Sequence, residues 1–209
     1  MTKNKEKYNQ KLLVEGKDDQ HVLWALCQQF GVKESFDVID CEGIENLLEQ
    51  IPQRLKQSGI ETLGIIIDAD TDINARWQSV KNSEALHKFE IPDQLPKEGL
   101  ICNNAERIKF GVWMMPNNKT NGMLEDFIAY LVPEKDQLFP IADNVLNDIE
   151  NRNLQKYSQN YKAKARIHTW LAWQEEPGTP LGQSITKKYL STDKATCLIL
   201  INWLRGFFG

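Results

Sequence analysis

The chain has 209 residues, of which 41% are hydrophobic and 26% are charged, and its formal net charge is −4. This length and composition favour a folded chain with a buried core, either one large domain or one domain with an appendage. Four scattered cysteines without a CxxC pair argue against a zinc site or a disulfide framework, and indicate a cytoplasmic protein. The polar start and the shortness of the apolar run CLILINWL argue against secretion and membrane insertion.

The charge is divided unevenly along the chain. Residues 151–209 carry nine Lys or Arg and three Asp or Glu, whereas residues 1–150 carry 16 basic and 26 acidic residues. An acidic body followed by a basic segment fits a metal site beside a phosphate-binding surface. The same charges also fit ordinary solvated helix faces, because the basic residues are not dense.

The first third of the chain alternates short apolar runs with helical patterns. Strands are expected at 11–15, 36–40 and 62–68, and helices at 18–30 and 44–55. A proline at position 52 is expected to end or kink the second helix. The order β-α-β-α-β is typical of a parallel sheet with crossover helices.

The pattern is less regular further along the chain. We expect a helix at 73–89, a loop at 91–100, and a hairpin whose clearer strand covers 109–115. The later segments comprise a helix around 123–131, amphipathic helices at 145–154 and 162–174, and an apolar helix or strand at 195–208. The predicted fold class is α/β, with a mostly parallel four-stranded sheet flanked by helices.

The stretch GIIIDADTD, residues 64–72, is the most informative part of the sequence. Its apolar run predicts a buried parallel strand, followed by Asp68, Asp70 and Asp72 at alternate positions. Open α/β sheets bind ligands just beyond the carboxyl ends of their strands. Since crowded carboxylates repel one another, a hard cation such as Mg²⁺ or Mn²⁺ is the simplest partner. Asp72 is better interpreted as the N-cap of the next helix.

Three further acids fall at predicted junctions between strands and helices. Glu15 ends the first strand, Asp19 lies one turn into the helix that follows, and Glu125 begins a later helix. The carboxyl ends of parallel strands meet at one edge, so these acids are expected to join Asp68 and Asp70 there. Five carboxylates can hold two partly hydrated metal ions.

Each of these acids also has a plainer interpretation. Asp19 favours the helix dipole wherever it points, and Glu125 can pair with Lys119. Asp126 is expected to face solvent. A helix cap needs one acid, however, and the sequence places several together, which favours the metal site.

Four sequence elements, LLVEGKDD, CEG, IIIDADTD and NGMLED, occur in this order, each near an expected strand-to-helix junction. Together they resemble the Toprim domain, the catalytic module of primases, topoisomerases, recombination proteins and OLD-family nucleases. The resemblance covers roughly residues 10–132, in which the first, third and fourth elements match the EGxxD/E motif, the DxD motif and the late acid of OLD-like members. No P-loop GxxxxGK[ST] is present, so the ATPase half of OLD proteins is missing.

The resemblance implies a domain organisation. A Toprim-like catalytic domain would cover residues 1–132, with an inserted segment at about residues 71–108. A mainly helical carboxyl-terminal extension packed on it would cover residues 133–209.

The resemblance also implies roles for the acids. Asp68 and Asp70 would chelate a Mg²⁺ or Mn²⁺ ion, and Asp19 and Glu125 would help to bind a second one. Glu15 would act as general acid or base, or as a bridging ligand. Water would be the nucleophile.

Binding of a phosphate also needs fixed positive charge. Lys162, Lys164 and Arg166, within YKAKARIH, are the candidates for substrate binding, and Lys164 is the first choice for stabilising the transition state. The alternative is that this segment is a solvated helix face.

The six tryptophans invite a comparison with base-stacking platforms. Trp24, Trp170 and Trp173 stand at helical positions, however, and are expected in the core instead. The Trp- and Phe-rich segment near residue 205 can also support a homodimer.

The leading hypothesis is a Mg²⁺- or Mn²⁺-dependent phosphodiester-processing enzyme, most simply a nuclease acting on DNA or RNA. One alternative is a non-catalytic protein that binds nucleic acid or a nucleotide. A second is the partner subunit of a separately encoded ATPase. A response-regulator-like domain also gathers acids around Mg²⁺, but Glu15 and Glu125 argue against it.

Overall fold

A five-stranded sheet forms the centre of the computed structural model, which describes residues 6–209. The strand order is β2-β1-β3-β5-β4, in which β1, β2, β3 and β5 are parallel and β4 runs antiparallel to β5. The strands are β1 (Gln10–Val14), β2 (Asp37–Asp40), β3 (Thr62–Asp68), β4 (Leu100–Asn103) and β5 (Lys109–Met115). The α/β class is confirmed.

The sheet has one strand more than the four predicted. The expected hairpin is present, and its first arm is β4, which pairs with β5 through Leu100 and Val112. Because β4 has only four residues and begins just after the turn at Gly99, its sequence gives little periodic signal. The two edge strands of the sheet are therefore β4, beside β5, and β2 on the opposite side.

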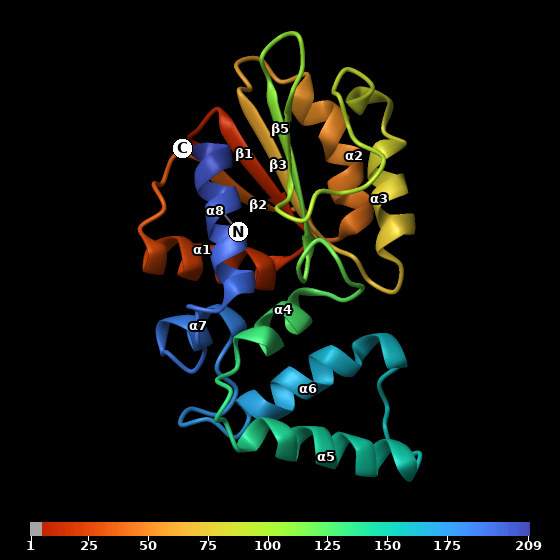
Figure 1. The fold of residues 1–209 in the computed structure, drawn as a ribbon, viewed down its shortest axis with the longest axis vertical. Coiled ribbons are helices and arrows are strands. Elements are labelled where there is room, and N and C mark those ends of the chain that lie inside the picture. Colours follow the sequence, from red (N-terminus) through yellow and green to blue (C-terminus); the bar gives the residue numbers. More distant parts are fainter. Residues whose placement is uncertain (1–5) are drawn as a thin grey trace.

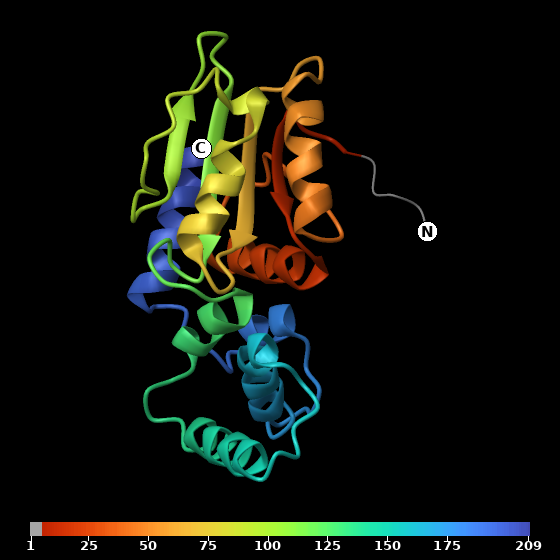
Figure 2. The same cartoon turned by 90° about the vertical axis from the view of Figure 1, so that its right-hand side faces the viewer.

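Helices cover both faces of the sheet, so the body has three layers (Figures 1 and 2). One face is covered by α1 (Lys17–Phe30) and α8 (Ala195–Phe208), and the other by α2 (Ile44–Leu55) and α3 (Ile73–Lys81). The helix expected at 73–89 is shorter: it ends at Lys81 and is followed by the 3-10 turn η1 (Glu84–Leu86). Pro52 lies inside α2 and does not end it.

The remaining helices form a lobe beyond the carboxyl edge of the sheet, at the bottom of Figure 1. They are α4 (Leu124–Leu131), α5 (Leu138–Asn151), the 3-10 turn η2 (Gln159–Tyr161), α6 (Lys162–Leu171) and α7 (Leu181–Thr186). Helix α7 was not predicted, because its six residues are too few for a clear periodic pattern. Helix α5 begins seven residues before its expected start.

A continuous apolar core joins this lobe to the sheet. The same cluster of buried side chains contains Ile66 from β3, Ile128 from α4, Ile167 from α6 and Leu200 from α8. The domain boundary expected at residue 132 falls between α4 and α5. The later helix α8 returns to cover the sheet (Figure 1), so both parts of the chain contribute to one core.

Two glycines explain how closely α8 approaches the sheet. Gly64 of β3 and Gly111 of β5 are register partners, and the ring of Phe207 lies across both. A Cβ atom would come within 2.6 Å of Phe207 Cε1 at Gly64 and within 2.7 Å of Phe207 Cε2 at Gly111. The sequence did not decide between helix and strand for residues 195–208. They form a helix, and its buried face packs on the sheet surface at these two glycines.

Two of the three tryptophans expected in the core are partly exposed. Trp170 is fully buried, but Trp24 is 42% exposed and Trp173 is 38% exposed. Trp24 lies on the outer side of α1, because its neighbours Leu23 and Ala25 already occupy the buried side. Helical spacing alone did not identify which side faces the sheet.

Helix α8 also bears on two other expectations. The aromatic side chains that suggested a homodimer, Trp203, Phe207 and Phe208, are buried inside the chain and are not available to a second copy. Within residues 6–209, no helix has both the length and the apolar character needed to cross a membrane.

Candidate functional site

All five acids predicted to form a metal site line one cleft at the carboxyl edge of the sheet. The cleft has a volume of about 670 Å³. Its walls come from the ends of β1 and β3 and from the starts of α1, α4 and α6. The charged residues that line it are Glu15, Lys17, Asp18, Asp19, Asp40, Glu42, Asp68, Asp70, Glu125 and Lys164.

Glu15 connects the ends of β1 and β3. It directly follows β1, and its Oε1 accepts a hydrogen bond of 2.7 Å from the backbone N–H of Asp68. Its own carbonyl accepts a 2.7 Å hydrogen bond from the N–H of Gly43, which turns the chain into α2 with a φ of +122°. The carboxylate therefore points along the sheet edge toward the DxD element.

The DxD element is held by the chain segment that precedes α4. Asp68 Oδ1 accepts a 2.9 Å hydrogen bond from the N–H of Leu124. Asp70 and Gly122 exchange two backbone hydrogen bonds, of 2.9 and 2.8 Å. Gly122 has a φ of +137°, and a Cβ atom there would lie 2.6 Å from Asp126 Oδ2, so only glycine fits. The turn in NGMLED thus positions both the DxD strand end and the late acid.

Asp19 and Glu125 enter the cleft from two helix starts. Asp19 is buried in the first turn of α1, where its Oδ2 accepts a 3.1 Å hydrogen bond from the N–H of Gly16. Glu125 is 3% exposed, and its Oε1 lies 3.0 Å from Nζ of Lys164 on α6. The expected pairing of Glu125 with Lys119 is thus replaced by a pairing across two helices.

The acids raise one another's pKa values. Burial, followed by the charges of Asp19, Glu15, Glu125 and Asp70, raises the pKa of Asp68 well above its ordinary value. Burial and then the charge of Glu15 raise the pKa of Asp19 to about 7. Burial also raises the pKa of Glu15. The crowded acids therefore oppose one another's ionisation.

Two cations partly balance this charge. Arg76 pairs with Asp70, and Lys164 pairs with Glu125. Burial disfavours the charged form of Lys164, yet its hydrogen bond and charge contact with Glu125 raise its pKa, so it remains an ammonium group. When all five acids are ionised, these two cations leave the site net negative.

The chemistry of the donors fits a hard divalent cation, although their present arrangement is not that of a coordination sphere. All five predicted ligands are carboxylates, the donors that Mg²⁺ and Mn²⁺ prefer. Within the described part of the chain, however, no three His, Cys, Asp or Glu side chains are placed so that they could hold a metal ion. Backbone N–H groups hold one oxygen each of Glu15, Asp19 and Asp68. Coordination would therefore use their second oxygens after side-chain rotation.

Of the three predicted phosphate-binding residues, only Lys164 lies at the cleft. Lys162 pairs with Glu150 of α5 at 2.6 Å, and Arg166 pairs with Asp143 of α5 and covers the ring of Phe139 at 4.1 Å. Positions 162 and 166 are four residues apart and share the helix face toward α5, whereas position 164 faces away from it. Both pairs hold α6 on α5, so the structure does not bring Lys162 and Arg166 to the site.

The structure also places residues at the cleft that the sequence analysis did not single out. Lys17 lies within the EGxxD element, and Tyr161 directly precedes the basic segment of α6. Asp72 caps α3 as predicted, accepting hydrogen bonds from Asn74 and Ala75. Asp126 is half-buried rather than solvent-facing, because it accepts a 2.9 Å hydrogen bond from the N–H of Met123.

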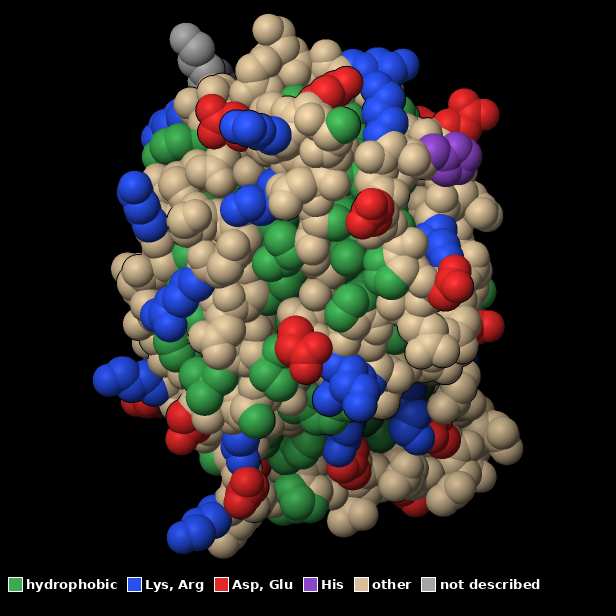
Figure 3. Space-filling model, turned by 45° about the horizontal axis from the view of Figure 1, so that its top comes forward, with side chains coloured by type: hydrophobic (Ala, Val, Ile, Leu, Met, Phe, Trp, Pro, Cys, Tyr) green, Lys and Arg blue, Asp and Glu red, His purple; other side chains and the backbone are tan. Residues whose placement is uncertain are grey.

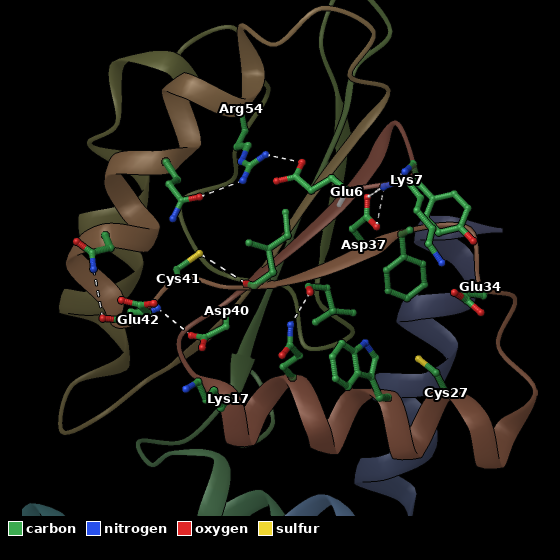
Figure 4. A pocket seen from close by; sticks show the side chains of 18 of the residues that line it. Glu6, Lys7, Lys17, Cys27, Glu34, Asp37, Asp40, Cys41, Glu42 and Arg54 are labelled. Atoms are coloured by element: carbon green, nitrogen blue, oxygen red, sulfur yellow. Dashed lines mark hydrogen bonds and ion pairs between the residues drawn. The ribbon is translucent and has the colours of Figure 1, made fainter. Parts of the chain in front are cut away.

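A larger hollow, of about 1250 Å³, lies beside the edge strand β2 between α1 and α2 (Figure 4). Three of its acids are engaged with neighbouring groups. Glu6 pairs with Arg54 and Lys11, and Asp37 pairs with Lys11. Asp40 accepts a hydrogen bond from the N–H of Glu42. The hollow therefore lacks the excess of converging carboxylates found in the cleft.

The uneven distribution of charge along the sequence does not give this face of the molecule a single sign of charge (Figure 3). On the face drawn in Figure 3, basic and acidic side chains are interspersed. The concentration of acids described above is in the cleft.

Comparison with known proteins assigns the chain to a family without assigning it an activity. The family described as "Protein of unknown function (DUF3226)" matches residues 9–209. The chain belongs to the DUF3226 family. No curated protein and no solved structure matches it. The match spans both the sheet and the helical lobe.

Proposed function

We propose that this DUF3226 protein is a Mg²⁺- or Mn²⁺-dependent phosphodiester-processing enzyme, specifically a Toprim-type nuclease that acts on DNA or RNA. The observation that carries the proposal is the meeting of Glu15, Asp19, Asp68, Asp70 and Glu125 at the carboxyl edge of a mostly parallel sheet. The order of the four sequence elements, which lie at the ends of β1, β2 and β3 and at the start of α4, gives further support.

The charge balance of the cleft supports a metal rather than a purely structural role. A set of carboxylates that served only to cap helices would not need to be buried together, because each raises the pKa of the others. Two divalent ions would remove this repulsion and supply a polarised phosphate together with an activated water. Asp68 and Asp70 would hold one ion, and Asp19 and Glu125 would help to hold the second.

The chain's own residues then have separate tasks. Glu15, fixed by the N–H of Asp68, would bridge the metal ions or exchange a proton with water or the leaving oxygen. Lys164 would move from Glu125 to the phosphate and stabilise the charge that develops there. Arg76 would keep Asp70 oriented.

The direct test is cleavage of plasmid and of single-stranded DNA or RNA in Mg²⁺ or Mn²⁺. We expect Asp68→Asn and Glu15→Gln each to lower cleavage by at least a hundredfold, on the scale of losing a group that acts in the transition state. The matched control is Asp148→Asn, which changes the same group on the exposed face of α5 and should leave cleavage unchanged. Cleavage that persists in the Asp68→Asn/Glu15→Gln double variant would refute the proposal.

One observation favours a second candidate, a non-catalytic protein that binds nucleic acid or a nucleotide. Within residues 6–209, no three acids are set around a metal position, and Lys164 is already paired with Glu125. One fold can host unrelated functions, so a sheet edge of this kind can bind a ligand without catalysing a reaction. Salt-dependent binding of an oligonucleotide without turnover over many hours, in the presence of Mn²⁺, would select this candidate.

A further inference from the structure

One side chain in the cleft has no part in the roles assigned above. Tyr161 lines the cleft, and 56% of its surface is exposed. Among the described residues that line the cleft, it is the only aromatic one. Within residues 6–209 its ring stacks on no other aromatic side chain. Its ring face is therefore free for contact with a ligand.

Tyr161 stands in a fixed relation to Lys164. It ends the turn η2 and immediately precedes α6, Lys164 follows three residues later, and both side chains line the cleft. The rise between them along the helix axis is about 4.5 Å. When Lys164 holds the phosphate of a nucleotide, the base of that nucleotide or of its neighbour is therefore within reach of the Tyr161 ring.

The other cation at the cleft completes this arrangement. Lys17 lies at the start of α1, on the opposite wall from α6, and its side chain is exposed. Within the described part of the chain, Lys17 and Lys164 are the only basic residues that line the cleft. The cleft thus offers two ammonium groups, one from α1 and one from α6, and one aromatic side chain.

We infer that Tyr161 is a specificity-determining residue that stacks on a base, and that the cleft takes single-stranded nucleic acid. This inference rests on the proposed function. Bases in a duplex are stacked on their neighbours, so an aromatic side chain cannot cover them, whereas an unpaired base presents its face. Stacking on tyrosine tolerates every base, so we expect a preference for strand state rather than for sequence.

The chain supplies a matched control for Tyr161. Tyr130 is also on the surface, with 44% of its area exposed, but it lies on α4 outside the cleft. Tyr161→Ala and Tyr130→Ala therefore remove the same ring from comparable exposure, and only the first changes the cleft. Tyr161→Phe keeps the ring and removes the hydroxyl, so it separates stacking from hydrogen bonding.

The experiment compares one labelled oligonucleotide, presented single-stranded or as a blunt duplex, in two measurements. Cleavage is followed in Mn²⁺, and binding is followed by fluorescence anisotropy in Ca²⁺, which fills oxygen sites while slowing turnover. We expect the wild-type protein to favour the single strand in both. Tyr161→Ala should weaken single-strand binding and cleavage about tenfold, while Tyr161→Phe and Tyr130→Ala match the wild type and all variants melt at the wild-type temperature.

The outcomes separate this inference from the nuclease proposal. Cleavage that does not depend on Tyr161, or that is as fast on the duplex, overturns the inference and leaves the nuclease standing. Binding that depends on the Tyr161 ring but gives no cleavage supports the inference and refutes the nuclease. The absence of Tyr161-dependent binding to either form also overturns the inference.

Discussion

At the scale of single residues, Asp68 is held in place by a hydrogen bond while its surroundings oppose its ionisation. Its Oδ1 is fixed by the N–H of Leu124, while burial and four neighbouring acids oppose its charge. The hydrogen bond keeps the side chain in place whether or not it is ionised. A group that the fold orients but does not neutralise is typical of a functional site rather than of a stabilising contact.

Asp68→Asn should therefore stabilise the metal-free protein. Asparagine keeps an oxygen for the N–H of Leu124 and removes the charge. In EDTA at pH 8 we expect its melting temperature to exceed that of the wild type by several degrees, which is the size expected for one or two kcal/mol in a chain of this length. In Mn²⁺ the order should reverse, because only the wild type keeps the full set of acids. Calorimetry under both conditions decides; a variant that is less stable in EDTA contradicts the account.

The pH dependence of stability should follow Asp19. Its pKa is raised from 3.8 to about 7 in the folded chain, so between these values the folded protein keeps a proton that the unfolded chain releases. Its contribution to stability is thus complete below about pH 4 and is lost as the pH rises through about 7. Thermal melts from pH 4.5 to 8 in EDTA should show a decline that Asp19→Asn makes shallower.

The comparison between wild type and Asp19→Asn is needed because other acids act in the opposite direction. The pKa values of Glu6 and Asp37 are lowered despite their burial, by hydrogen bonds and charge contacts with Lys11 and neighbouring groups. Equal slopes for the two proteins would show that Asp19 does not carry the effect.

The sequence predicted the acids of the cleft better than its cations, for a physical reason. Glu15 and Asp68 follow buried strands, and the parallel arrangement alone brings such positions to one edge. The direction of Lys162, Lys164 and Arg166 depends on which face of α6 meets α5, and a helix of ten residues with mixed polarity does not reveal that face. Exposure of Trp24 and Tyr161 depends on tertiary packing in the same way.

At the scale of elements, α8 approaches the sheet closely where the Phe207 ring lies over Gly64 and Gly111. Gly111→Ala would bring a Cβ atom within 2.7 Å of Phe207, so we expect a loss of about 1–3 kcal/mol of unfolding free energy from overpacking. The loss should be smaller when Phe207→Leu is also present, because the ring is then gone. Urea unfolding of the single and double variants measures this coupling.

The control for this prediction lies on α8 itself. A Cβ atom added at Gly206 would meet only Ile101 Cδ1, at 3.9 Å, which is an ordinary contact. Gly206→Ala should be neutral or stabilise the protein by about 0.5–1 kcal/mol, because alanine favours the helix. If Gly111→Ala behaved like Gly206→Ala, the close approach of Phe207 would be wrong.

The elements themselves were predictable where a continuous apolar run or an amphipathic pattern covered enough residues. The strands β3 and β5 and the helix α2 appear at the expected positions, the last despite Pro52. The four-residue strand β4 and the six-residue helix α7 are too short for a period to be seen, and they form because neighbouring elements cover them. Both depend on tertiary contacts more than on local propensity.

At the scale of the whole molecule, one apolar core extends from the sheet through the lobe. Since Ile66, Ile167 and Leu200 belong to the same buried cluster, we expect a single cooperative unfolding transition in calorimetry. A chain that stops at residue 132 lacks α8, and one face of its sheet would be exposed. We expect it to aggregate or to unfold without cooperativity; a stable, cooperatively folding fragment would show that the lobe and the sheet are independent.

The position of α8 in the chain has a consequence for biosynthesis. The helix that closes one side of the sheet is translated roughly 80 residues after β5, the last of its strands to emerge. During that interval, Trp113 lacks its partner Trp203, and Gly64 and Gly111 lack the cover of Phe207, while the ribosome is still elongating the chain. We therefore expect the apolar face under α8 to stay exposed to chaperones and to other chains until residues 195–208 leave the exit tunnel.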